Sequence, residues 1–148
     1  MDQARALFRE YADWLAVDLC FQGFAEELAT LPGGYAPPRG CLLLAGPAGA
    51  AIGCVALRPI VVADAPDGTV GEVKRLYVKP AGRGQGLGER LVRAIVAAAR
   101  AAGYRELRLD TLAHMADARR LYERLGFVSC PPYYHNPLPG AVYLSRSL

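Results

Sequence analysis

The stretch RLYVKPAGRGQGLGERLV, Arg75 to Val92, decides the fold, because a strand pattern runs through a glycine-rich loop into a helix pattern. Four of the seven residues from Gly82 to Gly88 are glycine. The first N–H groups of a helix have no partner within it, and with the helix dipole they favour an anion such as a pyrophosphate. Glycines let such a ligand approach the backbone, and Arg83 adds a positive charge. A glycine-rich turn without a ligand is the alternative that this stretch alone leaves open.

Two familiar phosphate-binding loops do not fit this glycine spacing. The dinucleotide fingerprint G-x-G-x-x-G ends on Leu87 when counted from Gly82, and on Glu89 when counted from Gly84. The P-loop requires Gly-Lys followed by Ser or Thr, and the chain has no such triplet. The spacing therefore disfavours a dinucleotide-dependent oxidoreductase.

The size and charge of the chain indicate one domain without a nucleic-acid partner. A chain of 148 residues suits a single domain over residues 1–148. The net charge is +3, and the only lysines are Lys74 and Lys79. The arginines are spread from Arg5 to Arg146, without the block of like charge that is typical of a nucleic-acid-binding arm.

The cysteines and the longest uncharged segment indicate a cytoplasmic protein. The four cysteines form no Cys-x-x-Cys pair, and the chain has only two histidines, so we expect neither a metal site nor a disulfide framework. Residues 40–57 carry no charge, but the turn at Gly46, Pro47 and Gly49 divides them into two pieces of strand length. We therefore expect reduced thiols and no membrane-spanning helix.

Hydrophobic periodicity predicts one central sheet flanked by helices. Residues 2–31 have apolar positions three and four apart, which predicts two helices broken near residues 21–23. Residues 41–45, 51–61 and 69–78 predict an antiparallel meander. An alanine-rich helix from 86, a strand at 104–112, a short helix at 118–125 and closing strands at 127–130 and 141–148 follow. The whole predicts a mixed α/β (α+β) domain with a mostly antiparallel, twisted sheet.

A second motif gives the glycine loop a specific interpretation. The stretch ARRLYERLGFV, Ala118 to Val128, lies downstream on a predicted helix and strand. With Arg83-x-x-Gly86-x-Gly88, it resembles the two acetyl-coenzyme A (acetyl-CoA) signatures of the GCN5-related N-acetyltransferase (GNAT) family. The resemblance covers about residues 41–128. It implies a single-domain GNAT-like fold and an acyltransferase that uses acetyl-CoA as acetyl donor.

The resemblance also implies where acetyl-CoA binds. Its pyrophosphate would lie on the backbone N–H groups of the loop, and its pantetheine arm would pair with the preceding strand. Relatives often carry an asparagine where this chain has Met115, so that contact with the arm is lost, or replaced by Asp117 or by a main-chain group. A plain buried strand is compatible with the pairing, because only main-chain atoms would be used. The implied coenzyme-binding residues are Leu76, Tyr77, Val78, Arg83, Gly84, Gln85, Gly86, Leu87 and Gly88.

Two catalytic residues follow from the same resemblance. Tyr122 matches the tyrosine that gives a proton to the leaving thiolate, and a phenol suits this task because it is neutral near pH 7. The alternative is that Tyr122 is a core residue. Glu72 matches a glutamate that takes the proton of the acceptor amine, whose pKa is about 10 for a lysine-like group. The alternative for Glu72 is an ion pair with Lys74 on the same face of the strand, with a water chain or another group taking the proton of the amine.

The acceptor is expected between the first helices and the late strands. Prolines bound the segment PPYYHNPLPG, residues 131–140, and stiffen it for binding, although a rigid connector fits the same pattern. We expect a small-molecule or amino-acid-like amine that attacks the thioester directly, in an enzyme that forms a homodimer as many relatives do. The alternative function is a module that binds acyl-CoA without turnover. Candidate acceptor-binding residues are Trp14, Phe21, Gln22, Tyr133, Tyr134 and Asn136, with Asp18 and His135 as further candidates.

Overall fold

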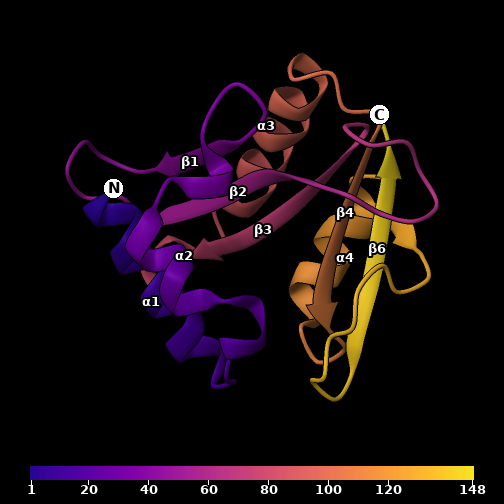
Figure 1. Ribbon diagram of the computed structural model, residues 1–148. Coiled ribbons are helices and arrows are strands. Elements are labelled where there is room, and N and C mark those ends of the chain that lie inside the picture. The colour runs from indigo at the N-terminus through magenta and orange to yellow at the C-terminus, as the bar shows by residue number, and fades with distance from the viewer.

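The computed structural model describes all residues from Met1 to Leu148 and has one six-stranded sheet with helices on both faces (Figure 1). Helices α3 (Leu87–Ala101) and α4 (Ala116–Arg124) cover one face, and α1 (Asp2–Leu15) and α2 (Phe24–Thr30) cover the other. The predicted mixed α/β fold is confirmed. The strands are β1 (Cys41–Ala45), β2 (Gly53–Ile60), β3 (Val70–Val78), β4 (Glu106–Leu112), β5 (Val128–Ser129) and β6 (Ala141–Ser147).

The sheet has the strand order β1-β2-β3-β4-β6-β5, and all neighbours are antiparallel except β3 and β4. The parallel pairing joins only Val70–Glu72 to Glu106–Arg108. Beyond it the two strands run apart, as Figure 1 shows. From Val73 to Val78, the edge of β3 that faces β4 therefore has no strand partner.

A β-bulge in β3 changes which side chains face which layer. The register with β2 shifts between Cys54 and Ala56, and Arg75 has a φ of 59°. An extra residue reverses the alternation of a strand. Val73 belongs to the core under α3, whereas Tyr77 packs on the α1 side.

The first helix ends earlier than its periodicity predicts. Ala16 has a left-handed conformation, with a φ of 55°, and donates its N–H to the last carbonyls of α1. A short 3₁₀ turn at Cys20–Gln22 follows, and α2 begins at Phe24. Leu19 is buried although it lies outside any helix. The prediction of a helix up to residue 21 is therefore wrong. Leu19 keeps the spacing of a helix in the sequence, but its side chain is buried from a segment that is not helical.

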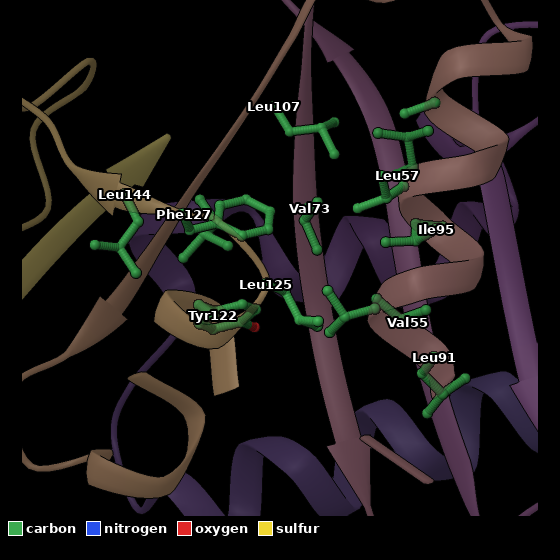
Figure 2. Packing of buried hydrophobic residues seen from close by; sticks show 14 of the residues in the cluster. Val55, Leu57, Val73, Leu91, Ile95, Leu107, Tyr122, Leu125, Phe127 and Leu144 are labelled. Carbon is green, nitrogen blue, oxygen red and sulfur yellow. The ribbon is translucent and has the colours of Figure 1, made fainter. Parts of the chain in front are cut away.

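The larger hydrophobic cluster lies between the sheet and α3 with α4 (Figure 2). The α3 residues at helical spacing are buried there, and Leu91 and Ile95 face Val55 and Leu57 of β2. Burying one such side chain is worth about 1.5–3 kcal/mol. This packing fixes the start of α3, and with it the glycine loop, against the end of β3. None of the helices has the length and hydrophobicity that a membrane span requires.

Candidate active site

The loop between β3 and α3 presents a row of free backbone donors. Every N–H group from Gly84 to Glu89 lacks a backbone acceptor within the chain. Gly84 and Gly86 have φ values of 78° and 75°, a region that glycine adopts without strain. A side chain on Gly88 would begin 3.4 Å from Leu121 of α4. The glycines thus permit the turn and the packing of α3, and they leave the helix start open to an anion.

Arg83 lies beside this loop and stacks on two aromatic rings. Its Nε donates to the carbonyl of Val78 at 2.9 Å, and its guanidinium lies 4.9 Å from the ring centroid of Trp14 and 5.7 Å from that of Tyr77. Trp14 also lines a cavity with Met115, at the start of α4. The structure therefore places Trp14 on the side of the glycine loop, and it does not bring Trp14 together with the other predicted acceptor residues.

A central cavity opens where β3 and β4 separate. It receives Tyr122 from α4, Lys74 from β3, Asp110 from β4 and Asn136 from the segment after β5. Its volume is about 50 Å³, and a water molecule needs roughly 10–15 Å³ of such space. The remaining lining is mainly apolar and comes from Tyr11, Leu15, Leu19, Gln22, Val73, Arg75, Leu76, Thr111, Leu112, Met115, Ala118 and Leu138.

Two further cavities adjoin the central one. The cavity that contains Trp14 shares Leu15, Met115 and Ala118 with it. An outer cavity on the other side shares Gln22 and Lys74 with it. The central cavity therefore borders one cavity beside Trp14 and another beside Glu72. The outer cavity is lined by Phe21, Gln22, Arg58, Ile60, Val61, Glu72, Lys74, Tyr133 and Tyr134.

Tyr122 is both a core residue and a cavity residue. Its ring packs edge-on against Phe127, with 5.5 Å between the centroids, and Figure 2 shows it within the hydrophobic cluster. Burial raises the pKa of Tyr122 well above its ordinary value, so the phenol remains protonated at neutral pH. A protonated phenol that lines the cavity can donate a proton there.

Glu72 is buried, and both of its carboxylate oxygens have partners. Oε1 accepts from Arg58 Nε at 2.8 Å, and Oε2 accepts from the Tyr133 hydroxyl at 2.7 Å. Lys74 Nζ lies 4.0 Å from Oε1, so the ion pair expected as an alternative role is present. Glu72 lines the outer cavity and not the central cavity that contains Tyr122.

Asp110 is the carboxylate that shares the central cavity with Tyr122, and it is not among the predicted catalytic residues. Its Oδ2 accepts hydrogen bonds from the Tyr134 hydroxyl and, at 2.8 Å, from Asn136 Nδ2. Its Oδ1 has only Lys74 Nζ nearby, at 3.9 Å. Burial lowers the pKa of Lys74, although Glu72 and Asp110 oppose this shift. Glu106 and Arg108 alternate with leucines in the same strand, so nothing in the sequence distinguishes Asp110 from them.

The predicted acceptor residues other than Trp14 lie together on this side of the sheet. The segment 131–140 brings Tyr133 and Tyr134 onto the sheet, and Gln22 Nε2 donates to the Tyr134 hydroxyl at 3.1 Å. The further candidates Asp18 and His135 are exposed. Met115 lines the central cavity, whereas Asp117 is exposed and pairs with Arg120. No group of His, Cys, Asp and Glu side chains has the arrangement of a metal site.

Comparisons with known proteins agree with this fold. The sequence profile of the Acetyltransferase (GNAT) family matches residues 4–127. An uncharacterised N-acetyltransferase of Schizosaccharomyces pombe is 42% identical over 97% of this chain and 86% of its own. The structure of an acyl-CoA N-acyltransferase from Klebsiella pneumoniae is 32% identical, with a TM-score of 0.72 over 97% of this chain and 88% of that chain. A GNAT family acetyltransferase from Elizabethkingia anophelis, solved with acetyl-CoA bound, has a TM-score of 0.59 at 23% identity over 74% of this chain and 77% of its own.

Proposed function

The chain belongs to the Acetyltransferase (GNAT) family, and we propose that it transfers the acetyl group of acetyl-CoA directly to the amine of a small-molecule or amino-acid-like acceptor. The family expected from the two signatures is confirmed, and with it the acyltransferase class and acetyl-CoA as donor. The nature of the acceptor and the roles of individual residues are our proposal.

The observation that carries this proposal is the central cavity with the two cavities that border it. The Tyr122 phenol and the Asp110 carboxylate line the same small space. One bordering cavity shares Leu15 and Met115 with it and lies on the side of the glycine loop, and the outer cavity shares Gln22 with it. Donor and acceptor would thus reach the same point from opposite sides, as direct transfer requires.

Acetyl-CoA would be held mainly by main-chain atoms. The free N–H groups from Gly84 to Glu89 suit the pyrophosphate, and the helix dipole of α3 adds to their attraction. The open edge of β3, at Leu76, Tyr77 and Val78, suits the amide groups of the pantetheine arm. That edge leads directly to the central cavity, where the thioester would lie.

In the proposed reaction, the amine nitrogen attacks the thioester carbonyl carbon. The C–N bond forms, the C–S bond breaks, and the thiolate takes a proton from the Tyr122 hydroxyl. We propose that Asp110, rather than the expected Glu72, holds the amine and accepts the proton that the nitrogen loses on attack, and that solvent then returns a proton from Asp110 to the Tyr122 phenolate. Asp110 Oδ1 has no hydrogen bond in the free protein, whereas Arg58 and Tyr133 occupy Glu72.

Heat stabilisation and thiol release test the proposal together. Acetyl-CoA should raise the melting temperature, and at least one member of a broad amine panel should release free CoA thiol with matching acetylated product. Stabilisation without thiol release from any amine would favour the alternative, a binding module without turnover.

Two matched variants separate the carboxylates. Asp110→Asn should lower kcat by about 100-fold, the lower end of the usual effect of a general base, and acetyl-CoA affinity should be unchanged. Glu72→Gln should retain more of the rate, because Glu72 does not line the central cavity. The reverse result, with Asp110→Asn active and Glu72→Gln inactive at equal coenzyme affinity, would return the role of base to Glu72.

A further inference from the structure

Lys74 is a buried cation without a hydrogen-bond acceptor. Its side chain is 3% exposed, yet the nearest carboxylate oxygens, Asp110 Oδ1 and Glu72 Oε1, lie 3.9 Å and 4.0 Å from Nζ. These distances exceed a hydrogen bond, so the three donors of the ammonium have no acceptor in the chain. Lys74 lines both the central and the outer cavity. Arg119 Nε is the fully buried side-chain polar atom without a partner, so the Lys74 ammonium is accessible from the two cavities, where a ligand can supply acceptor oxygens in place of water.

The neighbouring charges are already matched in pairs. Glu72 pairs with Arg58, and Arg75 pairs with Glu27 at 2.8 Å. The charges of Lys74 and Asp110 are left to balance each other, without contact. If an acceptor ammonium binds Asp110, as in the function proposed above, Lys74 keeps only Glu72, which lies 4.0 Å away and is already paired with Arg58. A simple amine would therefore add a second cation to a buried site, whereas an amine that carries its own anion would keep the site neutral.

The spacing of the two groups limits where that anion sits. Asp110 Oδ1 and Lys74 Nζ are 3.9 Å apart, so an amine on the first and an anion on the second must lie close together in the ligand. A carboxylate on the carbon that bears the amine meets this requirement. The central cavity is too small for a large side chain, which would extend into the outer cavity beside Phe21 and Ile60.

We propose that Lys74 is a specificity-determining residue that binds the carboxylate of an α-amino acid while Asp110 holds its amine. The inference rests on the proposed acetyl transfer and names the class of its acceptor. Lys74 supplies N–H donors to the carboxylate oxygens and takes no part in bond making. The apolar part of the outer cavity, at Phe21, Ile60 and Val61, favours amino acids with apolar side chains.

Matched acceptors test the proposal on the wild-type enzyme. Each L-amino acid of a panel is compared with its α-carboxamide and with the amine that lacks the carboxyl group, and kcat/KM is expressed per unprotonated amine. We expect the amino acid to exceed its amide by at least about tenfold, as for a charge-assisted hydrogen bond in a desolvated site. Equal values for acid and amide would overturn the inference and leave the proposed function intact. No transfer to any compound would overturn both.

Variants of the two lysines assign the preference to Lys74. Lys74→Gln should abolish the preference for the acid over the amide and leave acetyl-CoA affinity unchanged. Lys79→Gln is the matched control, because Lys79 is the only other lysine and pairs with Glu10 at the surface, and it should keep the wild-type ratio. A preference that persists in a folded Lys74→Gln enzyme would contradict the proposal. If this variant does not fold, the wild-type comparison of acid and amide decides the question.

Discussion

The two faces of the sheet differ in what they bury. Under α3 and α4, the cluster of Figure 2 consists of apolar side chains and two tyrosines. The hydroxyl groups of Tyr104 and Tyr122 are the polar side-chain atoms of this cluster. Under α1, α2 and the segment 131–140, the sheet buries a smaller apolar cluster and, in addition, Glu72, Lys74 and Arg75. Apolar burial stabilises the fold on both faces, but only the second face also holds charges whose desolvation opposes folding. Such groups are typical of functional sites.

The bulge in β3 connects the two faces. Because Arg75 has a φ of 59°, Lys74 and Arg75 both reach the polar side, and Arg75 contacts Glu27 of α2 and Gln22. The separation of β3 from β4 then lets Tyr122 of the apolar face line the same cavity as Lys74. The candidate site thus lies where the two faces meet through the sheet.

The largest effect should come from breaking the buried ion pair of the polar face. Arg75→Gln leaves the Glu27 carboxylate buried without its cation, and we expect a loss of about 4 kcal/mol in the free energy of unfolding by urea. The double variant with Glu27→Gln should be more stable than Arg75→Gln alone. Arg93→Gln, at an exposed pair with Glu89, is the control and should change little. A loss in Arg75→Gln as small as that of the control would show that the buried pair does not stabilise the fold.

A cavity in the apolar face should cost almost as much stability but no catalysis. Ile95 is fully buried, so Ile95→Ala should lower the free energy of unfolding by about 3 kcal/mol. Activity per folded molecule should remain near that of the wild type. Val61→Ala, at an exposed side chain, serves as the control for stability. A specific loss of kcat in Ile95→Ala would contradict the division of roles between the two faces.

A substitution in the glycine loop should affect coenzyme binding through the backbone alone. A methyl group on Gly86 meets no atom within 4 Å, but its φ of 75° is strained for alanine, so Gly86→Ala should shift the loop. We expect acetyl-CoA affinity, measured by calorimetry, to fall about tenfold, or about 1.4 kcal/mol. Gly49 has the same open surroundings and a φ of 77°, so Gly49→Ala should lower stability by a similar amount without weakening the binding of acetyl-CoA. Equal affinities in both variants would remove the loop from the coenzyme site.

An effect of similar size to that of Gly86→Ala is an alkaline loss of stability from Cys54 on the α1 side of the sheet. Burial raises the pKa of this thiol to about 12, against about 8.5 in an unfolded chain. The unfolded state therefore ionises first, so the contribution of Cys54 is present below its unfolded pKa and is lost as the pH rises toward 12. Between pH 8 and pH 10, the free energy of unfolding of Cys54→Ala should fall by roughly 1–2 kcal/mol less than that of the wild type. Parallel pH profiles would show that the thiol ionises alike in both states, and Ile95→Ala should keep the wild-type slope.

The apolar face and the glycine loop were predictable because they depend on local pattern. The helical spacing of Leu91, Val92, Ile95 and Val96 identified their burial, and the glycine spacing identified the open helix start. The polar face was only partly predictable. The sequence does not identify Lys74 as a site residue, because the bulge that follows it lies at Arg75, a residue type that does not predict a bulge. It does not identify Asp110 either, because Asp110 contacts Tyr134 and Asn136 only after folding.

The kinetics of Tyr122→Phe test most directly the claim that acetyl transfer occurs in the cavity where the two faces meet. The substitution removes one hydroxyl and keeps the ring that packs on Phe127. The acceptor is an amine that the wild-type enzyme acetylates. We predict that kcat falls by about 100-fold, because the thiolate loses its proton donor, and that the affinity for acetyl-CoA stays the same. An unchanged kcat at saturating substrates would contradict the account and remove Tyr122 from the reaction.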